Sequence, residues 1–193
     1  VVTISQSPDR FRAEVSFDSD KGAAKIKSTV VSDGKRVWIY RPDLNQYASL
    51  PYAKFEEVDD NYWVGMASYW FLAIPPDVRK EIARGALTDP AVQKELGLGG
   101  ATDIKGRTQT VDGQSLYAYE YRDKEGYVMR ALVDPQTAEL KQIVITGKSE
   151  GFNVVITERI LRRTANPTIN AATFQSPVRG QAKPVKTLAI GPL

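Results

Sequence analysis

Cysteine and histidine are both absent from the 193-residue chain. Without cysteine there is no thiol nucleophile and no disulfide, and without histidine there is no histidine-based triad and no zinc site of the HExxH type. The lack of cysteine does not identify a compartment, because a cysteine-free chain folds under oxidising and reducing conditions alike. We therefore expect no metal, no cofactor and no enzyme that depends on these residues.

An excess of charge of one sign is also missing. Lys and Arg number 26 against 23 for Asp and Glu, and the surplus of three equals the charge of Arg179, Lys183 and Lys186, because residues 164–193 contain no acid. A surplus confined to a tail does not predict nucleic-acid binding. No apolar run approaches the 18 or more residues of a membrane span.

Motifs for phosphate binding and for nucleophilic catalysis are absent too. The glycines within 97–100 form no GxGxxG or GxxxxGK[ST] pattern, and the chain has no GxSxG elbow. The acidic cluster at 56–60 lacks the ligand spacing of a calcium loop, so a solvated turn is the simpler interpretation. Catalysis is not expected.

Alternating apolar and polar residues dominate what the sequence does contain. From Phe11 to Phe17 every second residue is apolar, which is typical of a strand with one buried face. The dipeptides Asp33-Gly34 and Asp112-Gly113 predict tight hairpins. Further strands are expected at 24–32, 36–41, 46–50, 104–111, 114–122, 127–133, 139–146 and 152–163.

A helical insert is predicted at 59–100, between the two groups of strands. Its Trp and Tyr content favours helices that lie across an apolar surface, although Gly65 weakens the first helix and Pro75-Pro76 ends it. Strands on both sides of one insert indicate an α+β fold with a large antiparallel sheet. We expect a single domain over 1–193, ending in an extended tail at 175–193.

Apolar and aromatic residues exceed what one sheet face requires. Tyr117, Tyr119 and Tyr121 share one face of their strand. The same alternation is found at Tyr127, Met129, Ala131 and Val133, and at Phe152, Val154 and Ile156. One interpretation is a plain core between sheet and helices. The other is a cavity between a curved sheet and the insert, with apolar walls suited to acyl chains, each buried methylene contributing about 0.8 kcal/mol.

Four segments resemble LolA, the periplasmic carrier of outer-membrane lipoproteins. The segment 31–42, VSDGKRVWIYRP, is similar to the family signature VSDGKxLWFYxP. Weaker similarities are found at 8–12 (PDRFR, to the RPxxFxW strand), at 45–47 (NQY, to the strand that follows) and at 170–180 (NAATFQSPVRG, to the closing motif DxxxFxFxPPxG). Ser7 stands where the family has a lid-latching Arg before the Pro.

The resemblance implies an unclosed antiparallel β-barrel, a curved sheet whose concave face is covered by helices. It implies that a signal peptide, an N-terminal helix and a first strand precede Val1, and that Phe11 lines the cavity. Together with the aromatic pattern, it gives these expected residues of an acyl-chain groove: Phe11, Ala13, Val15, Phe17, Trp38, Tyr40, Met66, Trp70, Met129 and Phe152.

The function that this resemblance implies is that of a divergent LolA-like carrier. We expect a periplasmic protein, or an envelope-anchored one if its N-terminus is lipidated, that holds lipid or lipoprotein acyl chains. Its expected partners are an envelope membrane protein or an acceptor lipoprotein, and not nucleic acid. The alternative is a sensor or interaction module of the cell envelope like RseB. The resemblance implies that such a module has the same fold.

Overall fold

The computed structural model describes residues 1–17, 26–58, 60–65, 71, 74–95, 104–149 and 151–191. These residues are mostly β-structure and belong to two compact units. Unit 1 consists of Val1–Ala73 and Thr164–Leu193, and unit 2 of Ile74–Arg163. Each unit is built on a sheet of its own.

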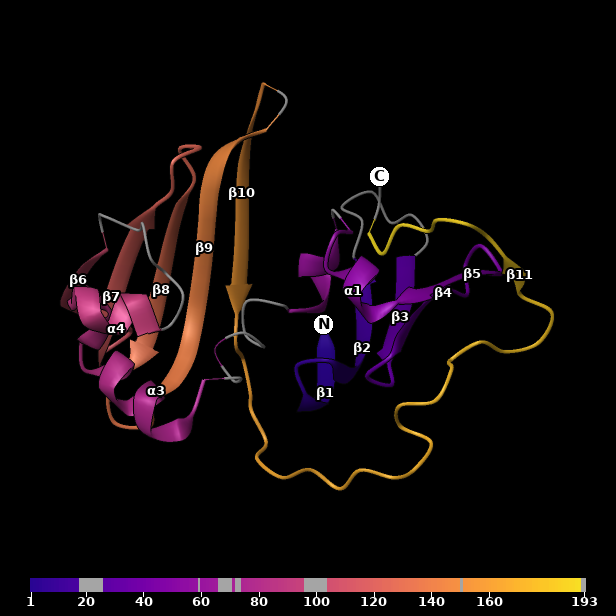
Figure 1. Cartoon of the computed structure of the whole chain (residues 1–193), viewed down its shortest axis with the longest axis horizontal. Helices are drawn as coiled ribbons and strands as arrows, with labels where there is room; N and C mark the ends of the chain where they lie inside the picture. Colours follow the sequence, from indigo (N-terminus) through magenta and orange to yellow (C-terminus); the bar gives the residue numbers. More distant parts are fainter. Residues whose placement is uncertain are drawn as a thin grey trace. The chain divides into compact units, whose positions relative to one another are not determined.

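Sheet A of unit 1 has six strands in the order β1-β2-β3-β4-β5-β11 (Figure 1). The first five form an antiparallel meander, and β11 pairs with β5 in parallel. The strands are β1 (Val2–Ser7), β2 (Arg10–Phe17), β3 (Ile26–Ser32), β4 (Arg36–Arg41), β5 (Gln46–Pro51) and β11 (Lys183–Pro184).

The hairpins form where the sequence predicts them. Between β3 and β4 the Asp33 carboxylate accepts hydrogen bonds from the backbone N–H groups of Lys35 (2.8 Å) and Arg36 (2.9 Å), and Gly34 has φ 95°. At the second predicted hairpin, Asp112 and Gly113 have φ 50° and 77°. Two successive positive φ angles are what the tightest hairpin turns require, and Asp-Gly tolerates them.

The core of unit 1 lies on one face of sheet A. The alternation in β2 places Phe11, Ala13 and Val15 on that face, and each of them is at most 1% exposed. Residues from outside the meander complete the core. They come from the short helix α1 (Tyr52–Phe55), the 3₁₀ turn η1 (Asn61–Val64) and the C-terminal segment, and are Phe55, Val64 and Ile190.

The segment 164–191, orange to yellow in Figure 1, binds sheet A in three places. Phe174, which is 3% exposed, packs under the guanidinium of Arg10, 5.1 Å from the ring centre. Further on, β11 pairs with the edge of β5. Finally Ile190 enters the core on the face opposite to the Arg10 side chain. The segment therefore covers parts of both faces of the sheet.

Sheet B of unit 2 has five antiparallel strands in the order β10-β9-β8-β7-β6. Short helices lie beside it, drawn at the β6–β8 part of the sheet in Figure 1. The elements are α3 (Pro76–Ala83), the 3₁₀ turn η2 (Ala86–Thr88), α4 (Pro90–Glu95), β6 (Lys105–Val111), β7 (Gln114–Arg122), β8 (Val128–Asp134), β9 (Glu139–Ser149) and β10 (Phe152–Arg159).

The predicted unclosed β-barrel, a single curved sheet with helices over its concave face, is wrong. The described strands form two separate sheets and no closed barrel, and the helices among the described residues are short and cover no concave face. The helices are short because glycine and proline residues interrupt the predicted insert. Gly65 ends η1 at φ 85°, Pro75 and Pro76 start a new helix, and Gly85 interrupts the next stretch at φ 113°. Aromatic content alone did not predict helix length.

Replacing Ile190 by Ala tests whether the C-terminal segment belongs to the core. Ile190 is 0% exposed, so the lost contacts and the cavity should lower the free energy of unfolding by about 2–5 kcal/mol. All three tryptophans precede residue 74, so urea unfolding followed by tryptophan fluorescence reports on unit 1. The matched control is Ile169→Ala, at a site 36% exposed, which should change stability by less than about 0.5 kcal/mol. Equal effects of both variants would show that Ile190 is not anchored.

Candidate functional site

The predicted groove residues of β2 lie in a sealed core. Phe11, Ala13 and Val15 are fully buried, and Phe17 is half-buried with its ring 4.8 Å from that of Trp63 in an edge-on arrangement. A fully packed core holds no room for an acyl chain. A glutamate at Phe11 is therefore expected to unfold unit 1, not to weaken a ligand site while the fold stays intact.

Trp38 and Tyr40 lie on the other face of sheet A. In β4 the core-facing residues are Val37 and Ile39. Ile39 lies opposite Val30 of β3, and Val30 lies opposite Ala13 of β2, so all three share one face. Trp38 and Tyr40, which point the opposite way, are half-buried. The structure thus does not bring the predicted residues of β2 and β4 to one surface.

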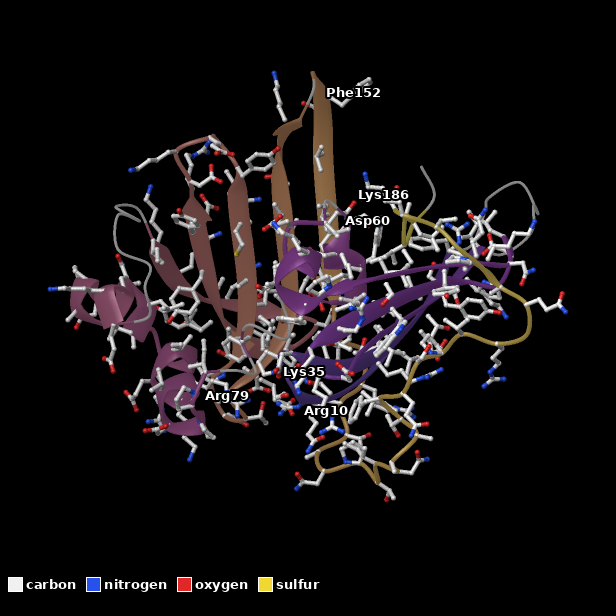
Figure 2. The ribbon with its side chains drawn as sticks, turned by 45° about the vertical axis from the view of Figure 1, so that its right-hand side comes forward. Arg10, Lys35, Asp60, Arg79, Phe152 and Lys186 are labelled. Carbon is white, nitrogen blue, oxygen red and sulfur yellow. The ribbon has the colours of Figure 1, made fainter. Side chains whose placement is uncertain are left out.

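The remaining predicted residues divide into two groups. Met66 and Trp70 lie outside the described residues. Met129 and Phe152 belong to sheet B, where 37% and 74% of their surfaces are exposed. Figure 2 shows Phe152 near the tip of the hairpin that joins β9 and β10. These two are the predicted groove residues that the structure leaves open to a ligand.

Polar contacts hold the C-terminal segment in the place where the groove was expected. The Asp60 carboxylate accepts hydrogen bonds from the backbone N–H groups of Ile190 (2.6 Å) and Gly191 (3.0 Å). The guanidinium of Arg41, 6% exposed, donates to the carbonyls of Ala189 (3.3 Å) and Gly191 (3.4 Å). The chain's own C-terminal residues therefore occupy this face of sheet A.

Sheet B carries a row of apolar side chains that crosses four strands. The pairing registers place Tyr121 of β7 beside Met129 of β8, Met129 beside Ile145 of β9, and Ile145 beside Ile156 of β10. At about 4.8 Å between strands the row is about 14 Å long. We call these four residues the open row, because Met129 is exposed and the other three are half-buried.

Tyr119, on the same face of β7 as Tyr121, is buried under α3 and η2. The hydroxyl of Tyr119 donates a hydrogen bond to the carbonyl of Ile82 at the end of α3 and accepts one from the backbone N–H of Leu87 (3.3 Å). Burial raises the pKa of Tyr119, so its hydroxyl stays protonated and able to donate. This contact fixes the helices over Tyr119 and leaves the open row beside them.

Three of the four residues of the open row could be assigned to apolar strand faces from the sequence. Alternation within β7, β8 and β10 identified Tyr121, Met129 and Ile156 as members of apolar faces. Their alignment could not be predicted, because it depends on the registers between strands, including an irregularity in β9 opposite Leu132 and Val133. Ile145 was missed as a site residue for that reason.

The part of the chain that the structure describes contains no group of three or more acidic, histidine or cysteine side chains able to hold a metal ion. Within the same residues, no helix is long and apolar enough to cross a membrane. The candidate site is the open row, a surface of apolar side chains.

Replacing Tyr119 by Phe tests the anchor that holds α3. The variant leaves the N–H of Leu87 without its partner, whereas the carbonyl of Ile82 keeps the hydrogen bond from the backbone N–H of Gly85 (3.0 Å). The loss should lower the stability of unit 2 by about 1–3 kcal/mol. Amide hydrogen exchange at β7 and η2 measures it. Tyr121→Phe removes the same hydroxyl from the open row and should leave exchange nearly unchanged. Equal exchange in both variants would contradict the anchoring role.

No protein-family model matches the chain, and no curated protein matches it either. The resemblance to LolA therefore rests on the sequence motifs alone, and a function for the open row has to be argued from its geometry.

Proposed function

We propose that the protein binds acyl chains of a lipid or lipoprotein in the bacterial periplasm, and that the open row of sheet B is the surface that holds them. The observation that carries this proposal is the continuous apolar row Tyr121–Met129–Ile145–Ile156, which contains no charged side chain. The LolA-like segment at 31–42 supports the class of ligand and the compartment.

The row suits a flexible hydrocarbon chain better than a rigid polar ligand. It is narrow, about 14 Å long and formed by an aromatic ring and aliphatic side chains. Met129 lies in its middle, and the unbranched, polarizable thioether adapts to ligands of different shape. Along β10 the same face continues through Val154 to the exposed Phe152, so a chain can follow the strand to the hairpin tip.

The expected affinity follows from the area buried. A fully buried methylene contributes about 0.8 kcal/mol, and contact on one side gives about half of that, so twelve methylenes contribute about 5 kcal/mol. Because association and ordering of the chain cost free energy, this gain sets a lower limit on the order of 0.1 mM for the Kd of one chain. A lipoprotein with two or three chains binds more tightly, which distinguishes such a ligand from a free fatty acid.

Titration with a fluorescent sixteen-carbon fatty acid tests the proposal, followed by competition with a synthetic diacylated lipopeptide. The lipopeptide should compete at lower concentration than the fatty acid. Met129→Glu places a charge in the open row and should weaken binding at least about tenfold, because the carboxylate must be desolvated against hydrocarbon. The matched control is Val155→Glu, a residue 68% exposed on the opposite face of β10, with binding within about twofold of the original protein.

The methyl resonance of Met129 gives a second, local readout. The chain has two methionines, Met66 and Met129, so ¹³C-methyl labelling yields two signals that one Met→Leu variant assigns. Lipopeptide should shift the Met129 signal at saturation. An original protein that binds neither probe, or equal loss in the two glutamate variants, would overturn the open row as the site.

A further inference from the structure

The second face of sheet B is cationic. Strand alternation and register place on it one or two basic residues from each strand, all of them exposed. They are Lys105, Arg107, Arg122, Arg130, Lys148 and Arg159, and we call them the cationic face.

Contacts confirm that these residues share a surface. The Nε of Arg130 donates to the Glu120 carboxylate at 2.8 Å, and the hydrogen bond lowers the pKa of Glu120, with further lowering by the positive charges of Lys105 and Arg122. A shallow depression of about 250 Å³ is lined by Lys105, Arg107 and Arg130 among others. A second depression is lined by Arg122 and Lys148 together with Glu125 of the β7–β8 turn.

Basic residues outnumber acidic ones among the described strand residues of this face. Of the described strand residues on this face, Glu120 is the acid that lies among the six cations. Asp134 and Glu139 lie at the end of the sheet, and both pair with Lys141, at 3.8 and 2.8 Å. The whole chain is therefore nearly neutral, although positive charge is concentrated on one face of sheet B.

We propose that the cationic face docks the protein on an anionic phospholipid surface. The cations are spread over five strands, about 19 Å across, on long flexible side chains, which fits many mobile phosphate groups in a plane. Single-stranded nucleic acid is bound with stacked aromatic rings, and the strand tyrosines of sheet B, Tyr117, Tyr119 and Tyr121, belong to the other face. Protein interfaces are rich in Trp and Tyr anchors, and the described strand residues of this face include neither.

This docking rests on charge and not on acyl-chain binding, so the two proposals fail separately. Basic residues close to an anionic membrane each strengthen binding about fivefold, and the attraction weakens as salt shortens its range. The open row needs contact with hydrocarbon and does not weaken with salt. A salt series therefore distinguishes the two faces in one protein.

Vesicle co-sedimentation with the full chain tests the docking. The protein should bind vesicles with 30 mol% phosphatidylglycerol at about 25 mM salt, lose most of that binding at about 300 mM salt, and not bind pure phosphatidylcholine. The triple variant Arg107→Gln/Arg122→Gln/Lys148→Gln should lower the partition coefficient at least about thirtyfold. The pair Lys148→Gln/Arg159→Gln, confined to the β9–β10 hairpin, should lower it at least about tenfold and serves if the triple variant does not fold.

The matched control removes the same charge elsewhere. Arg179→Gln/Lys183→Gln/Lys186→Gln neutralises three exposed cations of the C-terminal segment and should keep binding within about threefold. Equal loss in the two triple variants would show that net charge, not the cationic face, attracts the protein. That result, salt-independent binding, or no binding to anionic vesicles would overturn the docking surface. Fatty-acid titration of the cationic-face triple should remain unchanged, and a loss there would contradict the independence of the two faces.

Discussion

Burial of Ile190 in the core of unit 1 is the contact on which the interpretation of the molecule depends. Its side chain joins the cluster that contains Phe11 and Phe55, and the carboxylate of Asp60 holds its backbone. Arg41 is buried beside the same segment, and its pairing with Asp43 at 2.6 Å supplies the partner that a buried guanidinium requires. Because the segment fills this face, sheet A is a closed core and sheet B is left as the sheet with an accessible apolar surface.

The strands could be predicted because each prediction depends on neighbouring residues alone. Alternation from Phe11 to Phe17 and the dipeptide Asp112-Gly113 contain all the information that a strand or a tight hairpin needs, and the structure confirms both. The division into two sheets could not be predicted in the same way. It depends on which strand edges pair, and strand edges expose the same backbone groups whatever their side chains.

The candidate site shows the same limit at the level of single residues. Met129 and Phe152 were predicted because they are apolar members of alternating strands, and both are exposed on sheet B. Phe11 was predicted by resemblance to LolA, yet here Ile190 and Phe55 bury it. Sequence shows that a side chain faces the apolar side of its strand, but it does not show whether ligand or protein covers that side. Ile190, which packs on Phe11, lies 179 residues further along the chain, and nothing in the sequence near Phe11 indicates that contact.

Composition misled in a comparable way about charge. The sum over the chain is close to zero, and the surplus lies in the C-terminal tail. Strand alternation nevertheless separates charge from apolar surface within single strands: in β7, Tyr119 and Tyr121 point to one face, Glu120 and Arg122 to the other. Overall charge is an average over faces, whereas binding depends on one face at a time.

The two faces of sheet B place a physical constraint on how the proposed activities combine. They lie on opposite sides of the same strands, so a protein docked through Arg107 and Arg130 has Met129 turned away from the bilayer. Electrostatic attraction extends about 8 Å at physiological salt, whereas apolar binding requires contact. Docking therefore concentrates the protein at the membrane without inserting the open row into it. If both proposals hold, an acyl chain on Met129 and Ile145 faces away from the bilayer, and its exchange with the bilayer requires the cationic face to be released first.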